Sequence, residues 1–336
     1  MATTKEIKNR IKSVKDTQKI TNAMYLISST KMTRAKKELD NTRPYFDMLK
    51  RQIITMIHMT EDVKSGFFKS SPGFFEDGPV EEPVAFDMAA NVAAPDDEEE
   101  QAPDETIAYL VITADKGLAG AYNQNVIKEA IRLIDGRKNY KLFVVGEYGR
   151  HYFEARGLDI EETFLYTAQN PSLERAREIA SVLIDLYSKK KINKVYIVYT
   201  DFKNGLMGGD VISTEILPFD KRDFELDEAS EKLLEENESM SYLPDVVTVL
   251  NNIVPSYLMG YIYSALVDSY CSEQSARMSA MDAANNNAEE LLTSLNLEYN
   301  HVRQSAITQE ITEVSAGSRG QKKSKKKRME REEGSN

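Results

Sequence analysis

Apolar residues recur every three or four positions through the first sixty residues, which is the period of one face of an α-helix. Thr3 followed by Glu6 forms a capping-box pattern, which predicts that the helix begins there. Pro44 is expected to kink the helix or to restart it. A helix over 1–60 is ~80 Å long, too long for a compact domain of this chain length to bury. The apolar stripe is formed by Ile7, Ile11, Val14, Ile20, Met24, Ile27, Met32, Ala35, Leu39, Leu49, Ile53 and Ile57.

A second helical pattern occupies residues 244–317, and Pro255 is expected to separate a short helix from a long one. Beyond Pro255 the apolar positions alternate in steps of three and four, which is the heptad pattern of a coiled-coil seam. Asn285 is a polar position in that seam, of the kind that fixes register. The predicted seam consists of Met278, Met281, Asn285, Ala288, Leu292, Leu295, Tyr299, Val302 and Ala306.

Residues 106–218 alternate between strand and helix patterns. The run from 107 to 113 is continuously apolar, as expected for a buried parallel strand. Further strands are predicted at 140–145, 194–200 and 211–217, with helices at 123–135, 148–155 and 171–187. This order predicts a Rossmann-like α/β domain with a mostly parallel sheet.

The two long helices flank this domain, so one runs into it and the other runs out of it. The pattern favours a long antiparallel coiled coil of the N- and C-terminal helices with the α/β domain as its base. A packing of both helices on the sheet remains the alternative. The fold class is therefore α/β with a coiled coil.

The remaining segments differ in charge. The chain carries a net charge of −11, and residues 61–105 form an acidic, proline-rich stretch that we expect to be a flexible insert. Residues 219–243 are expected to be an acidic connection, and residues 318–336 a basic flexible tail. Five phenylalanines of the insert are possible docking points: Phe67, Phe68, Phe74, Phe75 and Phe86.

Motifs for chemistry are scarce. The single cysteine, Cys271, excludes a disulfide within the chain and is expected to be a buried small residue. The three histidines, His58, His151 and His301, have no second ligand at metal spacing. No apolar run is long enough to span a membrane. The basic N-terminus could mimic a transit peptide, although its early acidic residues argue against one. We expect no cofactor and no metal.

A glycine turn at residues 115–123 follows the first strand and precedes a helix, which is where a bound phosphate lies in nucleotide-binding domains. It fits neither the P-loop nor the dinucleotide-binding pattern, and a tight turn alone explains Gly117 and Gly120. A nucleotide-dependent enzyme is nevertheless the alternative function. The basic tail raises a third possibility, a free-standing scaffold that binds nucleic acid, although it lacks aromatic residues for base stacking.

Several stretches resemble the gamma subunit of the bacterial rotary (F-type) ATP synthase. Residues 5–11 (KEIKNRI), 17–24 (TQKITNAM) and 29–32 (STKM) are similar to the opening of that family. Residues 272–284 (SEQSARMSAMDAA) and 299–313 (YNHVRQSAITQEITE) are similar to its closing helix. The glycine turn is similar to the family's D-R-G-L-C-G turn, with Lys116 and Ala119 as departures. The resemblance thus covers both ends of the chain and the start of the domain.

The resemblance implies a central rotor shaft that is not itself an enzyme. The helix pair would turn inside a ring of alternating alpha and beta subunits, and the base would meet the epsilon subunit and the membrane ring of c subunits. The complex would lie on the cytoplasmic face of the plasma membrane, and this chain would bind neither nucleotide nor nucleic acid. Coupling contacts to the beta subunits would be made by Met24, Arg277, Arg303, Gln304, Thr308 and Glu313.

Two segments depart from the family pattern. The acidic insert is longer than the family usually carries at this place, and it has no cysteine pair of the kind that makes chloroplast forms thiol-regulated. The basic tail is also extra. We expect the tail to rest on acidic surface above the ring, which predicts that deleting 319–336 changes the salt dependence of activity.

Overall fold

The computed structural model describes residues 3–60, 65–69, 105–161, 167–202, 209–225 and 242–333. Its contacts divide the chain into two units, one made by residues 1–26 with 281–336 and the other by residues 27–280. The helices α1 (Thr4–Met59) and α6 (Val246–Glu333) each contribute to both units. Phe74, Phe75 and Phe86 of the predicted insert lie outside the described residues.

Helix α1 begins where the capping box predicts. The Thr3 N–H donates to the Glu6 carboxylate at 2.8 Å, and the Glu6 N–H donates to the Thr3 hydroxyl at 3.3 Å. The helix then continues through Pro44 to Met59, so of the two outcomes expected at Pro44, a kink or a restart, the restart is contradicted. Packing on both sides of Pro44 explains this, because tertiary contacts of an amphipathic helix outweigh a local cost of about 3 kcal/mol.

Helix α6 starts after Asp245, whose carboxylate accepts from the Thr248 N–H at 2.9 Å as an N-terminal cap. Pro255 lies inside the continuous helix and does not separate a short helix from a long one, contrary to expectation. The helix also extends to Glu333. Residues 318–333, which were expected to be a flexible tail, are therefore helical. Residues 318–333 are rich in Lys, Arg and Glu, which are good helix formers.

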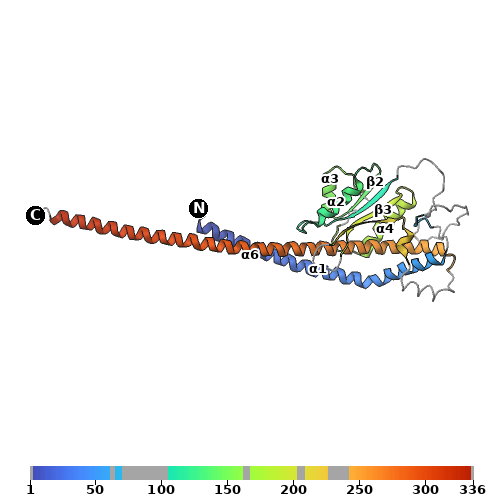
Figure 1. The fold of residues 1–336 in the computed structure, drawn as a ribbon, viewed down its shortest axis with the longest axis horizontal. Helices are drawn as coiled ribbons and strands as arrows, with labels where there is room; N and C mark the ends of the chain where they lie inside the picture. Colours follow the sequence, from blue (N-terminus) through green and yellow to red (C-terminus); the bar gives the residue numbers. More distant parts are fainter. Residues whose placement is uncertain are drawn as a thin grey trace. The chain divides into compact units, whose positions relative to one another are not determined.

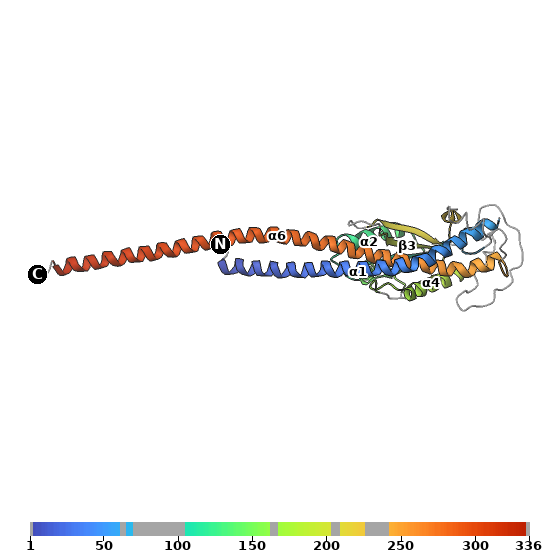
Figure 2. The ribbon, with the colours of Figure 1, turned by 90° about the horizontal axis from the view of Figure 1, so that it is seen from below.

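In the unit formed by the chain ends, α1 and α6 pair antiparallel (Figure 2). Thr21 donates its hydroxyl proton to Asn285, and Gln18 donates to Glu289 at 3.4 Å, so the partners step in opposite directions. The predicted seam is buried or half-buried from Met281 to Val302, and Asn285 makes the polar register contact that was expected. Ala306 is exposed, because α1 begins at Thr4 and offers no partner further along.

The α1 side of this pairing differs from the predicted stripe. Ile20 and Ile27 are 61% and 54% exposed, although both were placed on the buried face. The buried face keeps its heptad spacing through polar positions instead, among them Gln18, Thr21 and Ser28. The prediction placed the apolar residues on the buried face, but several positions of that face are occupied by polar residues.

The second unit is built on a four-stranded sheet in the order β2-β1-β3-β4. The strands are β1 (Ile107–Ile112), β2 (Tyr140–Val145), β3 (Lys194–Thr200) and β4 (Val211–Leu217). The first three are mutually parallel and β4 pairs antiparallel with β3, so the prediction of a mostly parallel sheet is confirmed.

Helices cover both faces of the sheet (Figure 1). Alternate residues of β1 face the layer of α2 (Tyr122–Ile134) and α3 (Glu147–Glu154), where Tyr109 packs with Val126 and Phe153. The other residues of β1, such as Leu110, face α4 (Leu173–Ser188) and the parts of α1 and α6 within this unit. The alternative in which the long helices pack on the sheet therefore holds for residues 27–59 and 246–280.

Gly260 allows α1 and α6 to approach closely within this unit. A Cβ at this position would lie 2.1 Å from Cδ1 of the Phe46 ring and 2.5 Å from its Cγ. We expect Gly260→Val to lower the free energy of unfolding by about 1–3 kcal/mol, because a well-packed interface has no room for added methyls. Urea denaturation of the two chains measures this, and Gly317→Val is the control because the space around Gly317 is open.

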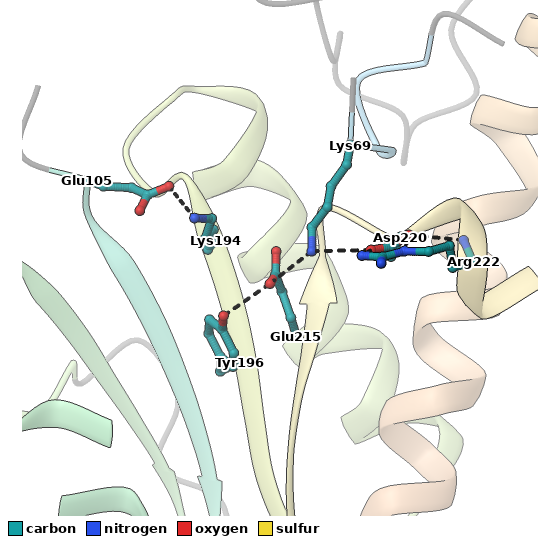
Figure 3. Close-up of polar contacts among 7 residues, drawn as sticks. All are labelled: Lys69, Glu105, Lys194, Tyr196, Glu215, Asp220 and Arg222. Carbon is teal, nitrogen blue, oxygen red and sulfur yellow. Dashed lines mark hydrogen bonds and ion pairs between the residues drawn. The ribbon is translucent and has the colours of Figure 1, made fainter. Parts of the chain in front are cut away.

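The start of the predicted insert is docked on the second unit. Phe67 and Phe68 are buried, which confirms docking for these two, and Phe68 forms a parallel bridge with Phe219. Lys69 lies between Glu215 at 3.1 Å and Asp220 at 3.8 Å (Figure 3). Asp220 precedes the short 3₁₀ helix η1 (Lys221–Phe224). At the other end of the insert, Glu105 pairs with Lys194 at 2.6 Å, so both flanks are attached to the sheet.

Candidate functional site

The six predicted coupling residues fall into two groups. Met24, Arg303, Gln304, Thr308 and Glu313 belong to the unit formed by the chain ends, whereas Arg277 belongs to the α/β unit. Met24 is half-buried on α1, and the four residues of α6 in the first group are exposed. The side chains of these five residues are therefore at least partly accessible to a partner protein.

Helix α6 beyond the seam presents a continuous exposed surface. Every residue from 303 to 322 is exposed. Apolar side chains follow helical spacing along this stretch, with Ile311 64% and Val314 73% exposed. An exposed apolar stripe flanked by polar residues is typical of a surface that binds another protein. A shallow groove beside the stripe is lined by His301, Gln304, Ser305, Thr308, Gln309, Thr312 and Glu313.

The exposed face of α1 has a similar character. Ile20 is more than half exposed, and the half-buried Met24 follows it four residues later at helical spacing. Residues 20–30 carry no charged side chain, and Lys19 and Lys31 flank this stretch on either side. This face is therefore an uncharged, partly apolar surface with basic residues at its two ends, which suits contact with another protein.

Arg277 has a different environment. It is 9% exposed, and its Nη2 atom lies 2.6 Å from Oε1 of Glu273, one turn earlier on α6. The same nitrogen donates to the carbonyl oxygen of Gly117 in the glycine turn at 3.2 Å. Burial raises the pKa of Glu273, and the charge and hydrogen bond of Arg277 oppose that rise. Glu273 was missed by sequence reasoning, although its spacing of four from Arg277 in a helical pattern was a usable signal.

The glycine turn is held by its own side chains. Asp115 accepts hydrogen bonds from the backbone N–H groups of Ala168 at 2.8 Å, Gln169 at 3.2 Å and Glu147 at 3.3 Å. The carboxylate thus lies at the N-terminus of α3, where an anion would bind. Asn123 accepts from the Ala114 N–H at 2.9 Å. These bonds account for the turn without a nucleotide, so the geometry gives no support to the alternative of a nucleotide-dependent enzyme.

The other candidate groups carry no chemistry in the described parts of the chain. Cys271 is buried, and burial raises the pKa of its thiol to about 12, so the expectation of a buried small residue is confirmed. A search of the described residues finds no cluster of three or more histidine, cysteine or carboxylate side chains that could hold a metal. The same residues include no helix with the length and apolar character needed to cross a bilayer.

Asp268 on α6 is a half-buried residue whose carboxyl group has an unusual charge environment. Burial raises its pKa to about 7, and Asp201 adds to the rise, while Arg43 and the Ser264 hydroxyl oppose it. A folded-state pKa above the unfolded value means that protonation favours the folded form, so stability is lost as pH rises from about 4 to 7. We expect Asp268→Asn to raise the free energy of unfolding by about 1–3 kcal/mol at pH 8 and to have little effect at pH 4. Thermal unfolding at the two pH values measures this, and an equal effect at both would contradict the assignment.

Comparisons with known proteins agree on one family. The family model described as ATP synthase matches residues 3–320. The gamma chain of ATP synthase from Caldanaerobacter subterraneus subsp. tengcongensis is 40% identical over 93% of this chain and 98% of its own length. The gamma chain from Ruminiclostridium cellulolyticum is 37% identical over 93% of this chain and 97% of its own length.

Solved structures show the same fold. The central stalk and c ring structure of the Tetrahymena thermophila mitochondrial ATP synthase contains a chain with a TM-score of 0.51 and 23% identity, covering 79% of this chain and 99% of that one. A rotor chain of the Euglena gracilis mitochondrial enzyme has a TM-score of 0.52 and 14% identity, covering 90% and 98%. With a matching family model over nearly the whole length and relatives at up to 40% identity, the chain belongs to the ATP synthase gamma chain family.

Proposed function

We propose that this chain is the central rotor shaft of an ATP synthase, which couples ion-driven rotation of a c ring to ATP synthesis or hydrolysis in an alpha/beta head. The match of residues 3–320 to the family model is the observation that carries the proposal. Helices α1 and α6 are each continuous from the α/β unit into the paired chain ends, so one covalent structure joins the two ends of such a shaft.

The chain acts in this role as a non-catalytic subunit. Its partners are the alpha and beta subunits, the epsilon subunit and the c ring, and it needs neither a cofactor nor nucleic acid. The complex lies peripherally on the cytoplasmic face of the plasma membrane. The bonding of Asp115 inside the glycine turn supports a structural and not a nucleotide-binding role for that turn.

Contacts with the beta subunits are made by Met24, Arg303, Gln304, Thr308 and Glu313. Their support is the exposure of the four α6 residues and the partial exposure of Met24, beside apolar side chains that a partner could cover. A rotor needs contacts that break at every step, and exposed polar contacts are worth only about 0–1 kcal/mol each. Arg277, the sixth predicted contact, is buried against Glu273 and Gly117, so we assign it an internal role below.

Reconstitution tests the shaft role. Purified chain is mixed with alpha and beta subunits from the same source, and sustained ATP hydrolysis is measured with and without it. The shaft role predicts a stable complex whose hydrolysis depends on this chain. If the folded chain neither joins the head nor changes hydrolysis, the proposal fails.

Substitutions in the same assay test the contact residues. Each of Arg303→Ala, Gln304→Ala and Thr308→Ala is expected to change the hydrolysis rate by about fivefold at most, because about 1 kcal/mol corresponds to that factor. The triple variant should lose more than any single one. Ser294→Ala is the control, since Ser294 is exposed on α6 and belongs neither to the groove nor to the predicted contacts. An unaffected triple variant would remove these residues from the coupling surface.

A further inference from the structure

One side of α6 is both polar and buried where the helix passes the glycine turn. Ser269, Ser272, Glu273, Ala276 and Arg277 are spaced by three and one along the helix, so they share one side of it. Ser272 is 0% and Glu273 5% exposed. Burying a polar side chain without a hydrogen-bond partner is costly, so we identify the partner of each of these side chains.

The first contact point is the turn itself. Arg277 binds Glu273 at 2.6 Å and the carbonyl oxygen of Gly117 at 3.2 Å. Between these polar contacts, Ala276 packs against a small buried cluster. The planar guanidinium group fixes the direction of both bonds, since its N–H groups have a rigid geometry. The members of the small cluster are Ala114, Ala119 and Tyr122.

The second contact point is the end of β3. Ser269 accepts a hydrogen bond from the Thr200 N–H at 3.3 Å, and Ser272 donates to the Thr200 carbonyl oxygen at 3.4 Å. Ser269 and Arg277 are eight residues apart, which corresponds to ~12 Å along the helix axis. Two directional attachments at different heights on the same side of a helix oppose its rotation about its own axis.

The partner surface is itself fixed. Asp115 bonds to the backbone of residues 168 and 169, and Asn123 bonds to the backbone of Ala114 and, at 3.4 Å, to the carbonyl of Lys116. The Gly117 carbonyl therefore belongs to a turn whose backbone is fastened to β1, α2 and the segment before α4. An acceptor held in this way transmits force to the sheet and does not yield by local movement of the turn.

We propose that Glu273, Arg277 and the Gly117 carbonyl form a joint that fixes the rotational setting of α6 on the α/β unit. The proposal rests on the shaft role proposed above, in which torque must pass between that unit and α6. Apolar packing is non-directional and tolerates small rotations, whereas hydrogen bonds weaken steeply with angle. Arg277 lies three residues before Ala280, the last residue of the unit.

The stiffness of the shaft in the assembled complex tests the joint. A bead is attached to the α/β unit through Lys138→Cys, and the spread of its angular position is recorded while the head is stalled. The paired variant Glu273→Gln with Arg277→Met removes both charges without leaving one unpaired. It is expected to increase the variance of the angular position about twofold, because one of two directional attachments is lost. Assembly and ATP hydrolysis should remain near those of the parent chain.

Two further variants frame the result. Arg277→Lys keeps the charge but loses the fork, so its variance should lie between those of the parent and the paired variant. Lys141→Met breaks the Lys141–Glu161 ion pair at the edge of the same unit and should leave the variance unchanged. If the paired variant fails to assemble, Glu273→Gln alone, which keeps an acceptor for Arg277, is measured and should show a smaller increase.

The outcomes separate the joint from the shaft role. An unchanged variance in the assembled paired variant, or in Glu273→Gln where that is the one measured, overturns the joint while the shaft role stands. A parent complex that assembles but never rotates the bead overturns the shaft role itself, and the joint falls with it. An equal increase in Lys141→Met would show general loosening of the unit and would also overturn the joint.

Discussion

Gly146→Ala is expected to lower the free energy of unfolding of the α/β unit by about 3 kcal/mol or more. Gly146 has a φ of +98°, which L side chains rarely adopt. An added Cβ would lie 2.3 Å from the Thr113 carbonyl oxygen, 2.7 Å from the Thr113 hydroxyl and 2.8 Å from the Ala114 carbonyl oxygen. Two of these atoms belong to the backbone that follows β1 directly. The clash can therefore be relieved only if the backbone at the C-terminal end of β1, which leads into the glycine turn, moves.

Hydrogen exchange measures this effect where it arises. Peptides that cover β1, β2 and α3 should exchange much faster in Gly146→Ala, whereas the paired chain ends should change little. Gly136→Ala is the matched control, because Gly136 also has a positive φ of +76° but no atom within 4 Å of the added Cβ. Its cost should be only about 1–2 kcal/mol, the backbone penalty alone. Equal costs for the two variants would show that the contacts with Thr113 and Ala114 relax freely.

Most of the fold was predictable because its elements have strong local signals. The strands at 140–145, 194–200 and 211–217 were predicted with the bounds that the structure gives, since short apolar runs between turns leave little choice. The seam of α6 was predictable because its apolar positions alternate in steps of three and four. The errors occurred where packing overrides a local rule. Pro44 and Pro255 break helices by propensity, yet both lie inside helices that are held by neighbours on the same unit.

The candidate site was less predictable than the fold, because its residues are defined by what they face. Exposure of Gln304 and Thr308 follows from the point where α1 begins, at Thr4, which no pattern within α6 reveals. Arg277 was singled out by resemblance as a partner contact, but its environment in the structure is an internal one. The polar sequence around it is typical of a solvated helix surface, and only its contacts with Glu273 and the glycine turn show that it is buried.

Arg277→Met alone is expected to cost about 3–5 kcal/mol in the free energy of unfolding at pH 8, because it leaves the Glu273 carboxylate buried without a partner. The cost should depend on pH. Burial already raises the pKa of Glu273, and Arg277 is the main influence that lowers it, so the variant raises that pKa further. A folded pKa above the unfolded one makes ionisation unfavourable to the fold, and the penalty disappears as pH falls below the unfolded value of about 4.3. Urea denaturation between pH 8 and pH 5 should therefore show the variant approaching the parent chain.

The paired variant Glu273→Gln with Arg277→Met separates loss of the ion pair from exposure of an unpaired charge. It has no buried carboxylate, so its cost should be smaller than that of Arg277→Met at pH 8 and nearly independent of pH. Lys31 and Asp115 also act on Glu273, the former lowering and the latter raising its pKa, and neither is changed in the comparison. If the two variants cost the same at every pH, Glu273 does not depend on Arg277 for its charge. The joint would then be held by Ser269 and Ser272 on Thr200, and the contact with Gly117 would serve only to fill space.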